Sequence, residues 1–193
     1  MENVRRSRKA RKQNEAKITA MFLIGALLLV FGVIGIILLS GNSQASSEFE
    51  NTPAEVSYPA PEINLVDLEG NSVSLEDYLG KTVMVNNWAT WCPPCKAEMP
   101  DLDRYYQTHK DEDFILIGIE AGDTEANVSS FVQSYGINFP IWLDAKQEAV
   151  QAFRNNGLPN SYIIDTSGTI RIVWNGAVTL KQLEKYVTPL LED

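Results

Sequence analysis

The chain holds two cysteines, Cys92 and Cys95, within the sequence WATWCPPCKAEMP. A disulfide between positions this close removes little conformational entropy from the unfolded chain, which disfavours a purely structural role. A zinc site needs three or four ligands, but the sequence offers one cysteine pair and a single histidine, His109. Covalent haem attachment needs CxxCH, and Lys96 stands where that histidine should be. The spacing therefore favours thiol–disulfide exchange, and we expect no metal.

The place of the pair predicts different roles for the two sulfurs. An apolar run, 82–88, is typical of a buried strand, and a helix is expected to begin at the cysteines. Pro93 and Pro94 suit a first helical turn, where backbone N–H groups have no partner within the helix. Those N–H groups favour negative charge and should lower the pKa of Cys92. We expect Cys92 to be the exposed nucleophile and Cys95 to be the shielded resolving cysteine.

A carboxylate follows the pair at helical spacing. Glu98 lies three residues after Cys95, so the two side chains should share one helix face. A partly buried carboxylate there could accept the proton of Cys95 as this sulfur attacks, although the spacing also suits an ordinary solvated glutamate. Pro100 lies inside the same expected helix, where it removes a backbone hydrogen bond and should introduce a kink.

The remaining sequence alternates strand and helix patterns. Strands are expected at 63–66, 73–75, 82–88, 114–120, 141–143, 161–165 and 169–174, and helices from the cysteines to about residue 109 and at 125–135, 147–153 and 180–191. Strands separated by helices, with a closing hairpin and helix, predict a mixed α/β sandwich with helices on both faces.

An apolar segment near the N-terminus predicts a membrane anchor. Residues 18–39 include no charged side chain, and as a helix they would be about 33 Å long, enough to cross a hydrocarbon core of about 30 Å. Basic residues precede this segment, so the positive-inside rule places the N-terminus in the cytoplasm and the body outside. A cleavable signal peptide stays open, because 43–45 is a small-x-small sequence, but the apolar segment is longer than such peptides usually have.

These features divide the chain into four parts. We expect a basic cytoplasmic tail at 1–17, a transmembrane signal-anchor at 18–39, a linker at 40–56 and a folded domain at 57–193. The formal net charge is −9, but residues 1–17 carry +5, so everything after them sums to −14 and is a poor partner for nucleic acid. This organisation predicts a single-pass membrane protein whose folded domain lies outside the cytoplasm, where disulfides persist.

The stretch from Trp88 to Pro100 resembles the active site of the TlpA/ResA-like membrane-anchored thiol-disulfide oxidoreductases of the thioredoxin superfamily. The resemblance continues through GKTVMVNNW and INFPIWLD to GLPNSYIIDTSGTIRIV and covers about residues 58–191. It implies an α/β thioredoxin-like fold, with a central mixed β-sheet flanked by helices, an N-terminal hairpin and a central helix–strand insertion. One transmembrane helix would precede this catalytic domain and hold it at the outer side of the bacterial cell membrane.

The resemblance also implies a set of site residues. Cys92 and Cys95 would form the redox disulfide, and Glu98 would be the active-site carboxylate. Leu158 and Pro159 would form a cis-proline loop that faces the cysteines and pairs with an extended client strand. The expected substrate-binding residues are Trp91, Pro93, Pro94, Leu158 and Pro159. No separate cofactor is needed, because the cysteine pair carries the electrons.

In function, the resemblance implies the reduction of disulfides in client proteins such as apocytochrome c, whose CxxCH must be reduced before haem attachment. A membrane thiol electron-transfer protein would then supply the electrons. Three alternatives stay open: an oxidase or isomerase that forms disulfides in exported proteins, a non-catalytic binding module, and a peroxidase.

The chain departs from the family pattern beside the expected groove. Asn86 replaces the buried aspartate of cytosolic thioredoxins, as is normal in this branch. Asn87 stands where an aromatic residue is usual, and Asn160 and Ser161 replace the commoner Thr-Thr or Thr-Ala after the proline.

Overall fold

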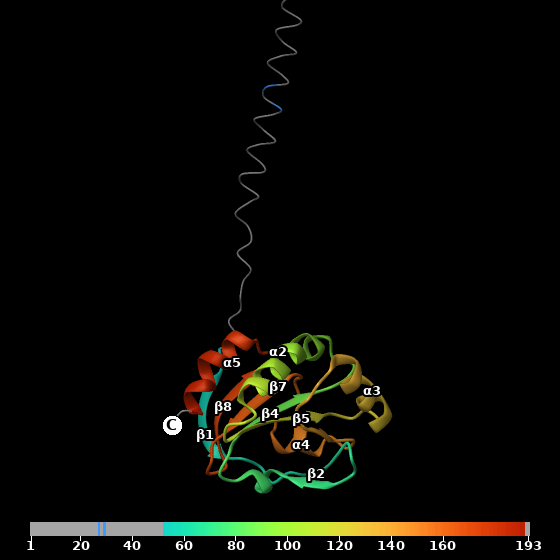
Figure 1. The fold of residues 1–193 in the computed structure, drawn as a ribbon, viewed down its shortest axis with the longest axis vertical. Helices are drawn as coiled ribbons and strands as arrows, with labels where there is room; N and C mark the ends of the chain where they lie inside the picture. Colours follow the sequence, from blue (N-terminus) through green and yellow to red (C-terminus); the bar gives the residue numbers. More distant parts are fainter. Residues whose placement is uncertain (1–26, 28, 30–51, 192–193) are drawn as a thin grey trace, which may run out of the picture. The chain divides into compact units, whose positions relative to one another are not determined.

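Residues 52–191 fold around one mixed β-sheet in the computed structural model, which describes these residues together with Leu27 and Leu29 (Figure 1). The eight strands lie in the order β1-β8-β7-β4-β5-β6-β2-β3. The strands are β1 (Ala54–Pro59), β2 (Asn64–Asp67), β3 (Ser72–Ser74), β4 (Thr82–Trp88), β5 (Phe114–Glu120), β6 (Ile141–Leu143), β7 (Asn160–Ile164) and β8 (Thr169–Asn175). The helices are η1 (Leu75–Tyr78), α2 (Pro93–His109), α3 (Glu125–Tyr135), α4 (Glu148–Ala152), α5 (Leu180–Tyr186) and η2 (Thr188–Leu190).

The centre of the sheet carries the strand that leads to the cysteines. Strands β4, β5 and β6 are parallel, whereas β7 runs antiparallel to β4 on its other side. Every residue of β4 is buried, which explains its nearly continuous apolar sequence. The predicted hairpins also form, β2 with β3 and β7 with β8. The expected α/β sandwich with a mixed sheet is therefore confirmed.

Apolar side chains form a core on each face of the sheet. One core packs α2, α3 and α5 against residues such as Met84, and the other packs η1 and α4 against residues such as Val85. Because side chains alternate along a strand, Asn86 lies on the α2 face and Asn87 on the α4 face. Adjacent asparagines of one strand thus belong to different layers of the molecule.

Two boundaries differ from the expectation by more than one residue. The expected linker, 40–56, overlaps β1, which pairs with β8 at the edge of the sheet. Most β1 side chains are exposed, so the polar, proline-containing composition of an edge strand looks like that of a linker. The helix expected at 180–191 ends at Tyr186 and is followed by the 3₁₀ turn η2, which contains Pro189. Proline has no N–H to continue the helical ladder.

The predicted anchor falls almost entirely beyond the part of the chain that the structure describes. Among residues 27, 29 and 52–191, no helix has the length and apolar character to cross a membrane. The basic tail, 1–17, and the segment 18–39 lie outside the described residues, apart from Leu27 and Leu29. The anchor and its topology therefore stay predictions.

Candidate active site

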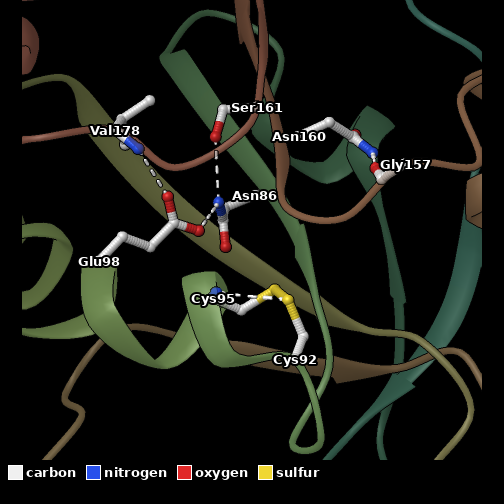
Figure 2. The surroundings of a disulfide bond; sticks show 8 residues. All are labelled: Asn86, Cys92, Cys95, Glu98, Gly157, Asn160, Ser161 and Val178. Atoms are coloured by element: carbon white, nitrogen blue, oxygen red, sulfur yellow. Dashed lines mark hydrogen bonds between the residues drawn. A yellow bond between two sulfur atoms is a disulfide. The ribbon is translucent and has the colours of Figure 1, made fainter. Parts of the chain in front are cut away.

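The two cysteines form a disulfide at the start of α2 (Figure 2). Cys92 is the N-cap residue, and its Sγ accepts a hydrogen bond from the backbone N–H of Cys95 at 3.3 Å. Pro93 and Pro94 occupy the first helical positions, where a missing N–H has no cost. The nucleophile therefore stands at the positive end of the helix dipole, a position that stabilises a thiolate. The predicted start of the helix at the cysteine pair is confirmed.

The exposure of the two sulfurs differs less than expected. Cys95 is fully buried, as predicted, but Cys92 is only 4% exposed rather than openly accessible. Cys92 lines a groove between the N-terminus of α2, the start of α4 and the loop that contains Leu158. These neighbouring segments surround its side chain. Cys92 nevertheless reaches this groove whereas Cys95 does not, so the predicted order of attack is compatible with the structure.

The groove beside Cys92 has a volume of about 460 Å³ and brings together residues distant in sequence. It is lined by Trp91, Cys92, Pro93, Pro94, Ala121, Gln147, Val150, Asn156 and Leu158. Four of the five expected substrate-binding residues are in this set, and Trp91 is 63% exposed. Pro159 is buried behind the lining, and the Leu158–Pro159 peptide bond is cis, as the resemblance implied.

Sequence reasoning missed the opposite wall of the groove. Ala121 follows β5, Gln147 is the N-cap residue of α4 and Val150 lies within α4. None of these residues belongs to a recognisable sequence motif. Only the parallel arrangement of β4, β5 and β6, whose carboxyl ends share one edge, carries these residues to the disulfide. A larger hollow of about 680 Å³ lies along β2 and β3, but neither cysteine lines it.

Glu98 is a buried carboxyl with two hydrogen-bond donors. It is 2% exposed, Oε1 accepts from Asn86 Nδ2 at 2.9 Å, and Oε2 accepts from the Val178 N–H at 2.8 Å (Figure 2). Burial raises the pKa of Glu98 to about 7, against the two hydrogen bonds, which favour the ionised form. A carboxyl of this kind can both bind and release a proton near neutral pH.

Asn86 links Glu98 to the strand that follows the cis-proline. Its Nδ2 also donates to Ser161 Oγ at 3.0 Å, directly across the β4–β7 ladder. The Oδ1 atom of Asn86 is buried without a hydrogen-bond partner among the described residues. Asn86, Glu98 and Ser161 therefore form one buried polar cluster on the α2 face of the sheet. Sequence reasoning had singled out all three but had no basis for connecting Val178 with them.

No cluster of three or more histidine, cysteine or acidic side chains in the described part of the chain could hold a metal ion. The redox-active group that the structure contains is the cysteine pair itself. A CxxC disulfide at a helix N-terminus, beside a cis-proline and a groove, on a mixed sheet with helices on both faces, defines a thioredoxin-like thiol-disulfide oxidoreductase.

Comparison with known proteins specifies this class further. The model of the AhpC/TSA family matches residues 56–173. The thiol-disulfide oxidoreductase ResA of Bacillus cereus (strain ATCC 10987 / NRS 248) is 32% identical over 167 residues, which cover 86% of this chain and 94% of the relative. The chain belongs to the AhpC/TSA family and, within the thioredoxin superfamily, to its ResA/TlpA-like thiol-disulfide oxidoreductases.

Solved structures share the fold. A thiol:disulfide interchange protein of the thioredoxin family from Chlorobium tepidum TLS is 30% identical, with a TM-score of 0.64, over 72% of this chain and 99% of its own. StoA from Bacillus subtilis is 25% identical, with a TM-score of 0.59, over 66% of this chain and 97% of its own. These likenesses cover the body that carries the disulfide and the groove.

Proposed function

We propose that this protein reduces disulfides in client proteins outside the cytoplasm. The observation that carries the proposal is the position of Cys92, which caps α2 and lines a groove while its partner sulfur is fully buried. One sulfur thus borders the groove in which a client would bind, and the other is kept for the second step. The family relatives named thiol-disulfide oxidoreductases support exchange chemistry.

The reaction begins with the dithiol form. The Cys92 thiolate attacks one sulfur of a client disulfide, which forms a Cys92–client disulfide and releases the first client sulfur as a thiolate. The Cys95 thiol then loses its proton and attacks Cys92 Sγ. This step forms the Cys92–Cys95 disulfide seen in the structure and releases the second client thiolate. Two electrons have then moved from the protein to its client.

Glu98 is proposed to receive the proton of Cys95. Glu98 lies one helical turn after Cys95 on α2, and both side chains are buried. Water has little access there, so a nearby base is needed to form the second thiolate. The pKa of Glu98, raised to about 7 by burial, allows its ionised form to accept this proton at neutral pH.

The client is proposed to bind as an extended segment along Leu158. This residue lines the groove and makes no backbone hydrogen bond to any described residue, so its N–H and C=O are available to an added strand. Trp91 offers a large exposed apolar surface on the Cys92 side. The pattern fits a client whose disulfide is flanked by an accessible stretch of chain.

The specific client and electron donor are proposed from the family resemblance. The client is apocytochrome c, whose CxxCH must be reduced before haem attachment, and a membrane thiol electron-transfer protein returns the disulfide to the dithiol. The predicted anchor at 18–39 would keep both reactions at the outer side of the cell membrane.

A Cys95→Ala variant tests client identity, because it cannot resolve the mixed disulfide and should hold its client covalently. We expect c-type apocytochromes among the trapped proteins, and none with the Cys92→Ala, Cys95→Ala control. A trapped set without them would remove cytochrome maturation from the proposal but keep disulfide exchange.

The direction of exchange is tested by the reduction potential. A value near about −270 mV or lower supports a reductase, whereas a value near about −120 mV identifies an oxidase. The binding-module alternative predicts that Cys92→Ala leaves cellular function intact. The peroxidase alternative predicts that the reduced protein consumes hydrogen peroxide without a client thiol.

A further inference from the structure

We propose that four asparagines form a brace that sets the position of the Leu158–Pro159 loop for client binding. The asparagine brace consists of Asn87, Asn155, Asn160 and Asn175. This inference rests on the proposed exchange with client disulfides and assigns these side chains a role in recognition, separate from electron transfer at the cysteines.

The brace holds Gly157, the residue immediately before Leu158, from both sides. Its N–H donates to Asn155 Oδ1 at 3.1 Å. Its carbonyl accepts from Asn160 Nδ2 at 2.5 Å (Figure 2). Leu158 and Pro159, joined by the cis peptide bond, lie between these two residues in the sequence. Two side chains therefore hold the loop at Gly157.

One backbone carbonyl orients the buried part of the brace. The Gly157 carbonyl can only accept, so the Asn160 amide must point its NH₂ group at the loop and its oxygen toward β4. Asn87 lies directly opposite Asn160 in the β4–β7 ladder, and its Nδ2 donates to Asn160 Oδ1 at 2.8 Å. Both side chains are fully buried. The loop is thus connected to the strand that leads into Cys92.

The outer part of the brace lies on β8. Asn155 Nδ2 donates to Asn175 Oδ1 at 2.5 Å, and Asn175 pairs with Asn160 in the β7–β8 ladder. Next to it, the Gly176 N–H donates to the Pro159 carbonyl at 2.8 Å. The loop is therefore fastened to the strands on both sides of β7.

The brace is placed to act on the groove rather than on the cysteines. Asn156 and Leu158, which line the groove, lie between residues that the brace fastens. Asn87 is on the α4 face of the sheet, opposite to the face that carries Glu98. None of the hydrogen bonds of the brace reaches Cys92, Cys95 or Glu98 within the described residues.

Asn87 and Asn160 depend on each other within the brace. Asn87 Nδ2 donates to Asn160 Oδ1, whereas Asn87 Oδ1 is buried without a hydrogen-bond partner among the described residues. Removal of either amide alone would leave a further polar atom of the other one buried without this partner, which is destabilising. The two side chains therefore have to be tested as a pair.

The test compares two disulfides in single-turnover, stopped-flow kinetics with the reduced protein. One substrate is a synthetic peptide with an oxidised CxxCH, and the other is hydroxyethyl disulfide, which has no backbone to pair with Leu158. For Asn160→Ala we expect the half-saturating peptide concentration to rise about tenfold, because the hydrogen bond to the Gly157 carbonyl is lost and Asn87 Nδ2 loses its acceptor. The limiting rate, the rate with hydroxyethyl disulfide and the reduction potential should stay at their wild-type values.

A double-mutant cycle adds a control for paired action. Asn87→Leu and Asn160→Thr should each weaken peptide binding, because each leaves the other asparagine without its partner. The double variant contains neither amide, so its loss of binding free energy should be smaller than the sum of the two single losses. If Asn160→Ala does not fold, the exposed Asn175→Ala replaces it, with an expected rise of about threefold.

Three results would overturn the inference: an equal loss with both disulfides, unchanged peptide binding in the variants, or additive losses in the cycle. A wild-type protein that reacts with neither disulfide would instead contradict the proposed function.

Discussion

At the scale of single residues, Glu98 is a carboxyl that is almost completely removed from water. Its carboxyl is 2% exposed and lies between two N–H donors that suit the ionised form, from Asn86 and from Val178. Burial favours the neutral form more strongly, so the pKa of Glu98 rises to about 7. The proton can therefore be held or released under working conditions, and both the rate and the stability should record this titration.

The first prediction concerns the rate at which Cys95 resolves the mixed disulfide. This rate should rise with pH through about 7 as Glu98 ionises. In Glu98→Gln the inflection should disappear and the rate at neutral pH should fall by about 100-fold, since proton transfer by a positioned group typically contributes at least that much. Stopped-flow measurement of client release gives the rate. The initial attack by Cys92 on a small disulfide serves as the control and should be retained, whereas a persisting inflection would exclude Glu98 as the acceptor.

The second prediction concerns the stability of the oxidised protein. The folded state keeps a proton on Glu98 up to about pH 7, whereas the unfolded chain releases it near the ordinary value of 4.5. Folding therefore binds a proton between these values, and the free energy of unfolding should fall by about 3 kcal/mol as pH rises through about 7. Urea unfolding at pH 5 and pH 8 measures this change. In the Glu98→Gln variant the free energy of unfolding should not show this fall. An equal fall in both proteins would refute the raised pKa assigned to Glu98.

At the scale of elements, the close contact of β4, β5 and β6 holds the site together, because all three end at the edge where the groove lies. Gly118 of β5 lies in a tightly packed part of this region. A Cβ at this position would lie 2.8 Å from both Ile141 Cδ1 and Phe139 Cε2 and 3.1 Å from Trp88 Nε1. The strand tolerates no side chain there without movement of its neighbours.

The third prediction follows from this packing. Gly118→Ala should lower the free energy of unfolding by about 1–3 kcal/mol, the usual cost of overpacking a core. Urea denaturation measures it. Gly157→Ala is the matched control, because its Cβ would meet only Asn155 Oδ1, at 3.5 Å, and a small effect is expected. Equal stabilities of the two variants would show that the sheet relaxes at Gly118.

At the scale of the whole molecule, the body is a redox domain, and we predict that the segment before it decides where it works. The groove has an exposed Trp91 and a Leu158 backbone that makes no hydrogen bond within residues 52–191. Such a groove suits clients that still have accessible chain, as exported proteins do before folding is complete. The predicted anchor, 18–39, would place the domain where such clients emerge.

The fourth prediction tests this placement. Full-length protein fused at its C-terminus to alkaline phosphatase should sediment with membranes and be active, since this reporter needs an extracytoplasmic location to form its disulfides. The size of the membrane-bound fusion distinguishes an intact anchor from a cleaved signal peptide. Removal of residues 1–51 should give an inactive fusion, and an active one would contradict the role assigned to 18–39.

The sequence by itself determined the chemistry and most of the elements. The spacing of Cys92 and Cys95 and their place between an apolar run and a helix are local features, and so are the periodic patterns that located the central strands and α2. Local patterns report which face of an element is buried, and this is why these predictions agree with the structure.

The tertiary structure alone decided which distant residues meet. β1 is a strand only because β8 supplies its hydrogen bonds, and its own composition resembles a linker. The Val178 donor on Glu98, the Gln147 wall of the groove and the asparagine brace all depend on contacts between separate segments. The raised pKa of Glu98 belongs to the same group, because burial is a property of the packed fold and no sequence spacing contains it.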